Sequence, residues 1–155
     1  MLGLGAGLAG CSGEGGGESS RCGPTTGTVE QVLDGDTIVL RSGERIRYLM
    51  VDAPETSGTA ECYGAEARSL NQQLVLEREV TLRYDEQCTD KYDRLLAYVT
   101  VDGREVNTVL VQRGMACVLH IPPNGADRKA EFEELEREAR DTGRGLWGFC
   151  DSKPC

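Results

Sequence analysis

Basic residues are in the minority in this sequence, where 17 Lys and Arg face 26 Asp and Glu and give a formal net charge of −9. A protein that coats nucleic acid by bulk charge needs the opposite balance, so that class is excluded. An enzyme that handles phosphodiesters at one local basic site beside a metal remains compatible with the acidic total. With 39% hydrophobic and 28% charged residues, the chain is neither a polytopic membrane protein nor disordered. Its 155 residues suit one domain with a tail.

Histidine is almost absent, since His120 is the only one. A structural zinc site would have to combine Cys117-x-x-His120 with Cys150-x4-Cys155, and the sequence lacks the paired CxxC motifs of such sites. Zinc therefore stays a minor alternative. Seven cysteines instead favour an oxidising compartment. Without Cys11, an even number remains, which suggests up to three disulfides with 15 possible connectivities. These six are Cys22, Cys62, Cys88, Cys117, Cys150 and Cys155.

The N-terminal segment resembles an export signal. Residues 1–10 are small and apolar, and Leu8-Ala9-Gly10-Cys11 resembles a bacterial lipobox, in which the cysteine is lipidated and becomes the new N-terminus after cleavage. The stretch is too short to span a bilayer as a helix, so we expect a processed signal over residues 1–11. It lacks the Lys or Arg that such signals carry, and a Gly-rich N-terminus with an incidental cysteine is the alternative.

Residues 12–24 are rich in Gly and Ser and indicate a flexible linker to a domain over residues 25–155. We therefore expect an exported protein that is lipid-anchored at the periplasmic or outer cell surface, or secreted. The membrane contact would be the lipid anchor alone.

Hydrophobic periodicity predicts an α+β domain. Residues 28–51 indicate a three-stranded meander with turns at Asp34-Gly35 and Ser42-Gly43. Further strands are predicted over residues 80–84, 95–101 and 115–119, and helices over residues 62–76, 107–113 and 127–142. Asn107 would cap the second helix. A small closed or part-open barrel suits this order, because closure removes exposed sheet edges.

Charged residues gather at three of the predicted turns, over residues 34–37, 47–56 and 90–94. Asp36 and Asp52 each stand at a strand end, where hard carboxylate oxygens suit Ca²⁺ or Mg²⁺. An Asp-Gly pair alone is more often a plain hairpin turn, and Arg47 with Glu55 alone is more simply a surface ion pair. The combination has the inventory of phosphoryl chemistry, which needs a cation, guanidinium groups and a base that orients water.

The chain from residue 28 to residue 147 resembles the staphylococcal nuclease (thermonuclease) family. Several motifs carry the resemblance in order, and together they are specific although each alone would be weak. They are Leu33-Asp-Gly-Asp-Thr-Ile38, Arg47 with Val51-Asp-Ala-Pro-Glu55, Tyr63-Gly-Ala-Glu-Ala67, Asp90-Lys-Tyr-Asp-Arg94, Leu96-Ala-Tyr98, Asp102-Gly-Arg-Glu-Val-Asn107, Arg113-Gly-Met-Ala116 and Gly145-Leu-Trp147.

The resemblance implies a five-stranded β-barrel of the oligonucleotide-binding (OB) type with three α-helices. It also implies a monomeric, Ca²⁺-dependent nuclease that hydrolyses DNA and RNA, preferably single-stranded, with little sequence preference and leaves 3′-phosphates. Ca²⁺ would be held by the carboxylates of Asp36 and Asp52 and by the backbone carbonyl of Ala53.

By the same resemblance, Glu55 would orient or deprotonate the attacking water. Arg47 and Arg94 would hold the scissile phosphate, and losing one such donor typically lowers the rate about a hundred- to a thousandfold. Lys91 and Tyr92 would contact a terminal phosphate of the bound nucleotide.

Two positions depart from the family pattern. His120 stands where a tyrosine commonly packs against the nucleotide, and it would stack, donate a hydrogen bond or merely face solvent. Asp93 replaces a glycine; it tolerates a left-handed conformation, but its charge would weaken phosphate binding or recruit more metal.

For the cysteines, the resemblance implies that a disulfide holds the loop with Lys91 and Arg94 in place. The implied pairs are Cys62–Cys88, Cys117–Cys150 and, for the two that are left, Cys22–Cys155. The alternatives to an active nuclease are an inactive nucleic-acid- or protein-binding module of the same fold and a disulfide-stapled structural lipoprotein.

Overall fold

The computed structural model describes residues 20–155, and every structural statement below concerns that part of the chain. Residues 1–19, with the expected signal segment and its lipidation site Cys11, lie outside the described residues. The strands are β1 (Thr26–Asp34), β2 (Thr37–Leu40), β3 (Arg45–Tyr48), β4 (Met50–Asp52), β5 (Glu79–Thr89), β6 (Leu95–Val101), β7 (Arg104–Glu105) and β8 (Cys117–Leu119). The helices are α1 (Gly64–Val75), α2 (Val106–Gln112), α3 (Lys129–Asp141) and the short α4 (Leu146–Phe149).

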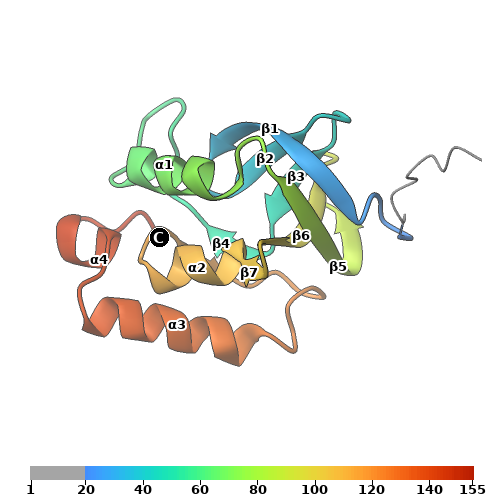
Figure 1. Cartoon of the computed structure of the whole chain (residues 1–155). Coiled ribbons are helices and arrows are strands. Elements are labelled where there is room, and N and C mark those ends of the chain that lie inside the picture. Colours follow the sequence, from blue (N-terminus) through green and yellow to red (C-terminus); the bar gives the residue numbers. More distant parts are fainter. Residues whose placement is uncertain (1–19) are drawn as a thin grey trace, which may run out of the picture.

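Five strands close into a barrel, so the predicted α+β fold is confirmed and the barrel is closed (Figure 1). β1, β2 and β3 form the predicted antiparallel meander, and β5 pairs with β1 and with β6. Closure occurs where β3 pairs in parallel with β6, with Ile46 opposite Leu95. The two-residue β7 pairs antiparallel with the end of β6. Closure satisfies the backbone groups that would otherwise line two free sheet edges.

Alternating burial along β3 puts its two arginines on the outside of the barrel. Ile46 and Tyr48 are buried, whereas Arg45 is exposed and Arg47 half-buried. Successive side chains of a strand point to opposite faces, so Arg47 is available to segments that pack against the barrel wall.

The chain leaves the barrel wall directly after β3. Met50 has a left-handed backbone conformation (φ 65°), an uncommon one for a residue that is not glycine. β4 then pairs with β8 in a separate two-stranded sheet, with Asp52 opposite Cys117. The predicted strand at residues 115–119 is thus confirmed in part, and its partner is β4, outside the barrel.

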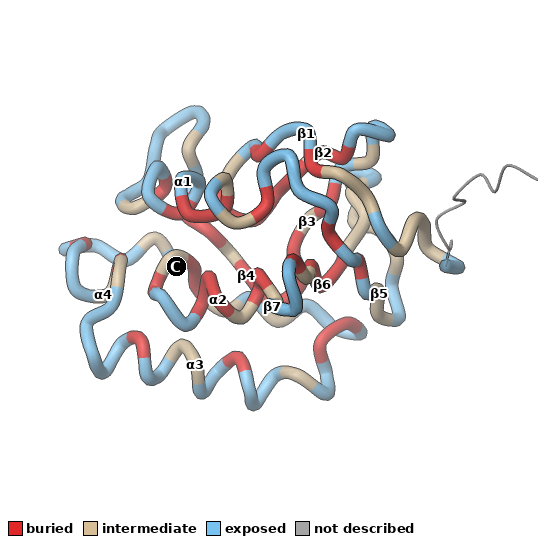
Figure 2. The backbone as a smooth tube through the Cα atoms, in the orientation of Figure 1, coloured by how far each residue is buried: buried red, intermediate tan, exposed pale blue. Residues whose placement is uncertain are grey.

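Three helices cover the barrel, as predicted, and the short α4 follows them. α1 packs against β1, α2 lies against β6 and α1, and α3 packs on α2 as an outer layer (Figure 1). Figure 2 shows α3 mostly exposed, with buried positions recurring along one side. These are Phe132 and Ala139, while ion pairs such as that of Arg137 with Asp141 (3.1 Å) cover the outer face.

The prediction that Asn107 caps the second helix is wrong. α2 begins one residue earlier, and Asn107 is fully buried. Its Oδ1 accepts a hydrogen bond from the Val99 N–H (2.9 Å), and its Nδ2 donates to the carbonyls of Leu49 (2.8 Å) and Ala97 (3.2 Å). One amide therefore joins α2, β6 and the link between β3 and β4.

All six cysteines of the domain are bonded, but the expected pairs are wrong. The disulfides are Cys22–Cys88, Cys62–Cys150 and Cys117–Cys155, in place of Cys62–Cys88, Cys117–Cys150 and Cys22–Cys155. The reason is that Tyr63, at the start of α1, packs against the cluster formed by Cys117, Leu146 and Cys150, which brings the residue before Tyr63 to the C-terminal segment. Within the described residues, no cysteine thiolate is left for the zinc alternative.

The folded domain begins before the expected boundary at residue 25. Besides the disulfide at Cys22, Arg21 donates to the carbonyl of Glu86 (3.0 Å), and the Tyr84 hydroxyl donates to the carbonyl of Pro24 (2.6 Å). Residues 20–24 are thus held against β5 and belong to the domain.

The buried position of Asn107 generates a stability prediction. Replacing it by Ala leaves the Val99 N–H and the Leu49 carbonyl buried without a partner, at about 1–3 kcal/mol for each group. We expect the free energy of unfolding to fall by about 3 kcal/mol or more in a denaturant titration. Gln112→Ala, at the exposed end of the same helix, should stay within about 0.5 kcal/mol of the parent. Equal effects of the two variants would contradict the crosslinking role.

Candidate active site

The turn between β1 and β2 brings Asp36 to the outer wall of the barrel. The Asp36 N–H donates to Asp34 Oδ1 (3.1 Å), which closes the turn. Gly35 is needed there because a Cβ would lie 2.6 Å from the Cβ of Ala53 and 2.8 Å from that of Ala67. The turn therefore packs directly onto α1 and onto the segment after β4.

A buried amide holds this turn from the helix side. Asn71 of α1 is fully buried; its Nδ2 donates to the carbonyl of Asp34 (3.1 Å), and its Oδ1 accepts from the Tyr48 hydroxyl (2.8 Å). Helix α1, the turn and β3 are thereby tied together beside Asp36.

The Asp36 carboxylate is only 5% exposed and is surrounded by donors. Its Oδ1 accepts from the Thr37 hydroxyl (2.9 Å), and its Oδ2 accepts from the Ala53 N–H (2.7 Å) and lies 3.2 Å from Arg47 Nη2. Burial raises the pKa of Asp36 to about 7, against the opposing effect of Arg47 and with a further rise from Asp34. The site thus holds an acid that is incompletely compensated in charge.

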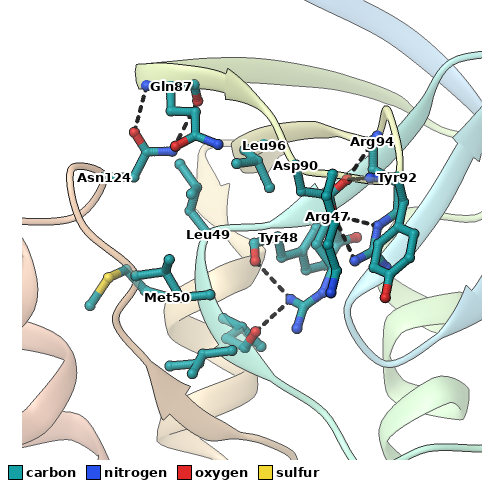
Figure 3. Close-up of a pocket in the computed structure, with 14 residues that line it drawn as sticks. Arg47, Tyr48, Leu49, Met50, Gln87, Asp90, Tyr92, Arg94, Leu96 and Asn124 are labelled. Carbon is teal, nitrogen blue, oxygen red and sulfur yellow. Dashed lines mark hydrogen bonds and ion pairs between the residues drawn. The ribbon is translucent and has the colours of Figure 1, made fainter.

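Arg47 joins the two predicted metal ligands. Its Nη2 lies 3.2 Å from Asp36 Oδ2 and 3.1 Å from Asp52 Oδ1. Its Nη1 donates to the carbonyls of Tyr48 (2.9 Å) and Val51 (2.5 Å), and the dashed lines at Arg47 in Figure 3 mark these bonds. Two carboxylate oxygens, one from the turn after β1 and one from β4, therefore converge on one positive centre.

Further carboxylates surround this centre. Burial raises the pKa of Asp52, with Arg47 opposing and Glu61 and Asp34 adding to the rise. Burial also raises the pKa of Glu55, and Asp34, Glu61 and Asp52 raise it further. Glu55 is thus near the acidic cluster yet exposed to solvent.

The donor set fits a hard divalent cation. Arg47 opposes the rise in pKa of Asp36, Asp52 and Glu55, and oxygen ligands of this kind are those that Ca²⁺ and Mg²⁺ prefer. No group of three or more His, Cys, Asp or Glu side chains in residues 20–155 converges closely enough to hold a metal by itself. A cation beside Asp36 and Asp52 would therefore need backbone carbonyls and water as well.

Glu61 was not found by sequence analysis. Its Oε2 accepts from the Glu55 N–H (2.8 Å), and its own N–H donates to the Glu55 carbonyl (2.9 Å). No pattern in the sequence distinguishes this glutamate from a solvated surface acid, because the contact depends on how the loop between the two residues folds.

The loop after β5 carries the second arginine. Asp90 Oδ2 accepts from both Nε and Nη2 of Arg94 (2.7 Å each), and Asp90 Oδ1 accepts from the N–H groups of Tyr92 (2.9 Å) and Arg94 (3.1 Å). Burial acts to raise the pKa of Asp90, but these hydrogen bonds hold that pKa below its ordinary value. Arg94 is therefore oriented by a charged partner within its own turn.

Arg47 and Arg94 line one hollow of about 370 Å³, here called the Arg47–Arg94 hollow (Figure 3). Lys91 and Tyr92 are also part of its lining, as their predicted role requires. The rest of the lining is Tyr48, Leu49, Met50, Val51, Gln87, Asp90, Leu96, Leu119, Ile121 and Asn124. The arginines thus share a hollow that is partly lined by aliphatic side chains.

His120 and Asp93 do not line this hollow. The side chains on either side of His120 do so instead, and the imidazole lies beside Gly125 with its Nε2 buried and without a hydrogen-bond partner. Asp93 has the left-handed conformation expected of it (φ 58°) and lines a separate hollow with Arg45 and Pro24. Ala53 is buried, with its N–H bonded to Asp36.

Comparison with known proteins agrees with this geometry. Residues 45–148 match the sequence family described as "Staphylococcal nuclease homologue". The chain is 37% identical over 127 residues to "Endonuclease YncB" of Bacillus subtilis (77% of this chain, 60% of that protein) and 36% identical over 127 residues to the "SPbeta prophage-derived endonuclease YokF" of the same organism (77% and 43%).

"Thermonuclease" of Staphylococcus intermedius is 34% identical over 125 residues, which cover 77% of this chain and 74% of that protein. The chain thus spans 60% and 43% of the two Bacillus proteins and about three-quarters of the staphylococcal one. The family match includes Arg47, Asp52, Glu55 and Arg94 and begins after Asp36. The chain belongs to the staphylococcal nuclease family.

Proposed function

We propose that this protein is a Ca²⁺-dependent nuclease that hydrolyses phosphodiester bonds of DNA and RNA with little sequence preference and leaves 3′-phosphates. One observation carries the proposal: Arg47 contacts both Asp36 and Asp52 and also lines the hollow that contains Arg94. A phosphate in that hollow would lie between two guanidinium groups and next to the carboxylates that suit a cation. The relatives named endonuclease and thermonuclease support the same class of activity.

The hollow accounts for binding without base selection. Arg47, Arg94 and Lys91 supply positive groups for the phosphate, and guanidinium forks match its oxygens. The lining includes aliphatic side chains such as Leu49 and Leu119, which accept a base of any identity because they offer no hydrogen bonds to its edge. Tyr92 is 60% exposed and offers a ring on which a base can stack.

Asp36 and Asp52, with the carbonyl of Ala53, would hold the cation. When bound, Ca²⁺ supplies charge neutralisation for the phosphoryl oxygens and a polarised water. The residues themselves do the positioning: Arg47 and Arg94 stabilise the charge that develops on the phosphate, and Glu55 accepts the proton of the attacking water or orients it. The raised pKa of Glu55 brings this carboxylate closer to the range in which a base is effective.

The first alternative to an active nuclease is a binding module without activity. Such a module has no use for a solvent-exposed carboxylate beside the two metal-type aspartates. Retention of Arg47, Glu55 and Arg94 together favours the enzyme.

Export to an oxidising compartment is part of the proposal, and three disulfides in the domain support it. A lipid anchor at Cys11 is proposed as the membrane attachment. None of the helices within residues 20–155 has the length and apolar character of a membrane span.

The proposed base generates the first activity prediction. In the oxidised full chain, Glu55→Gln should lower kcat on single-stranded DNA in Ca²⁺ by about a hundredfold or more, because the amide cannot accept a proton. Products would be separated on a denaturing gel, with phosphatase treatment to identify 3′-phosphates. Glu66→Gln, an exposed acid in the first turn of α1, is the matched control and should retain activity. Equal rates for the two variants would exclude Glu55 as the base.

Metal binding generates a second prediction, with stability as its readout. Ca²⁺ at a hundred times its dissociation constant should raise the free energy of unfolding by about 2.7 kcal/mol. Asp36→Asn and Asp52→Asn should remove most of that gain, and Asp127→Asn, an exposed acid on another loop, should not. An unchanged melting temperature in Ca²⁺ for the parent protein would contradict a calcium site here.

The raised pKa of Asp36 gives a pH prediction in EDTA. Its folded-state pKa of about 7 lies above the ordinary value of 3.8, so the folded state binds the proton more tightly than the unfolded state does. Stability therefore falls as the pH rises between these two values, by at most about 1.4 kcal/mol per pH unit for this group. Denaturant titrations from pH 4.5 to 7.5 should show a smaller decline for Asp36→Asn. Parallel curves for variant and parent would show that Asp36 titrates normally.

A further inference from the structure

We propose that Glu61 is a positioning residue for Glu55. The two residues exchange hydrogen bonds: the Glu55 N–H donates to Glu61 Oε2 (2.8 Å), and the Glu61 N–H donates to the Glu55 carbonyl (2.9 Å). The backbone of Glu55 is thus held on both its amide and its carbonyl by one residue. The inference rests on the proposed function, in which the Glu55 side chain acts on water.

The two hydrogen bonds between Glu55 and Glu61 join the two ends of the loop at residues 56–60, here called the neck of the loop. Residues 57–60 between the two glutamates are all exposed, and the Thr56 hydroxyl reaches the Leu33 carbonyl only at 3.4 Å. Without the Glu61 contact, little in the loop would restrain Glu55, since exposed loop segments open easily.

The far side of the neck is anchored firmly. The Glu61 carbonyl accepts from the Gly64 N–H (3.1 Å) at the start of α1, and the next residue, Cys62, is bonded to Cys150. A Cβ on Gly64 would lie 2.6 Å from the Glu55 carbonyl oxygen, so α1 abuts the backbone of Glu55 directly. Glu61 therefore links the backbone of Glu55 to the start of α1 and to the Cys62–Cys150 disulfide, and these two features fix where Glu55 lies.

A carboxylate at this place is unfavourable in charge. Glu61 adds to the negative field at Glu55 and Asp52, which already repel each other. The same hydrogen bond could be accepted by a neutral amide. The role of Glu61 therefore needs an acceptor oxygen on a side chain as long as that of glutamate, and it does not need the negative charge. Substitutions can change the side-chain length and the charge of Glu61 separately.

Two conservative variants make that separation. Glu61→Gln keeps the reach and an acceptor oxygen but loses the charge, whereas Glu61→Asp keeps the charge but shortens the side chain by one methylene. We expect Glu61→Gln to retain kcat within about threefold of the parent, and Glu61→Asp to lose about ten- to a hundredfold in kcat with KM within about twofold, because a small misplacement of a catalytic group is costly in rate. Glu66→Asp is the matched control and should leave both constants unchanged.

A second measurement reports the anchor without any reaction. Amide hydrogen exchange of the Glu55 N–H, followed by NMR on the full chain, should be slow in the parent and in Glu61→Gln and at least tenfold faster in Glu61→Asp. Melting temperatures of all variants show whether they are folded; if Glu61→Asp is not, Glu61→Ala takes its place with the same expected losses.

The outcomes separate the two proposals. If Glu61→Gln loses as much kcat as Glu61→Asp, the charge of Glu61 is required and a role as base or metal ligand replaces positioning. If neither variant changes kcat or the exchange of the Glu55 amide, the anchor does not exist. If the folded parent cleaves no nucleic acid although its Glu55 amide is protected as expected, the proposed function fails and the anchor alone remains.

Discussion

The burial of Asp36 constrains everything around it. A carboxylate removed from water must be matched by hydrogen-bond donors and positive charge, and one that loses its partner destabilises the fold by several kcal/mol. Here the donors come from the Ala53 N–H and the Thr37 hydroxyl, and the charge comes from Arg47. The turn after β1, the outer face of β3 and the end of β4 must therefore meet at one point. The contacts that stabilise the buried Asp36 carboxylate in this fold are the same contacts that bring the candidate metal ligands together.

The close approach of these segments depends on small residues and buried amides. Gly35 packs against the methyl groups of Ala53 and Ala67 with no room for a Cβ of its own. Asn71 and Asn107 then pin the backbone on either side, each bonding groups from separate elements. Neutral amides suit this task because they donate and accept at once, and burying them does not add charge to a site that already has an acidic excess.

Sequence analysis predicted what is local and missed what depends on distant segments. Periodicity located the strands of the meander within residues 28–51 and the helices at residues 62–76, 107–113 and 127–142, close to the bounds of α1, α2 and α3. The parallel pairing of β3 with β6 was not predicted, because periodicity says nothing about which strands pair. The cysteine pairs failed for the same reason, since pairing depends on the packing of α4 near the start of α1. At residues 119–121, the backbone decides which side chains face the hollow, and it turns His120 away.

The acidic balance of the chain continues into the site, where it bears on how substrate would be bound. Both arginines of the hollow already have carboxylate partners: Arg47 has Asp36 and Asp52, and Arg94 has Asp90. A phosphate that binds Arg47 must compete with Asp36 and Asp52. Asp36 is buried, so water cannot solvate its carboxylate if Arg47 leaves it. That competition is relieved when the aspartates acquire another positive partner, so in the proposed enzyme a cation and a phosphate strengthen each other's binding by linkage. Arg94 lacks this coupling, because Asp90 is held by its own loop through two backbone amides and keeps Arg94 oriented whether or not a cation is present.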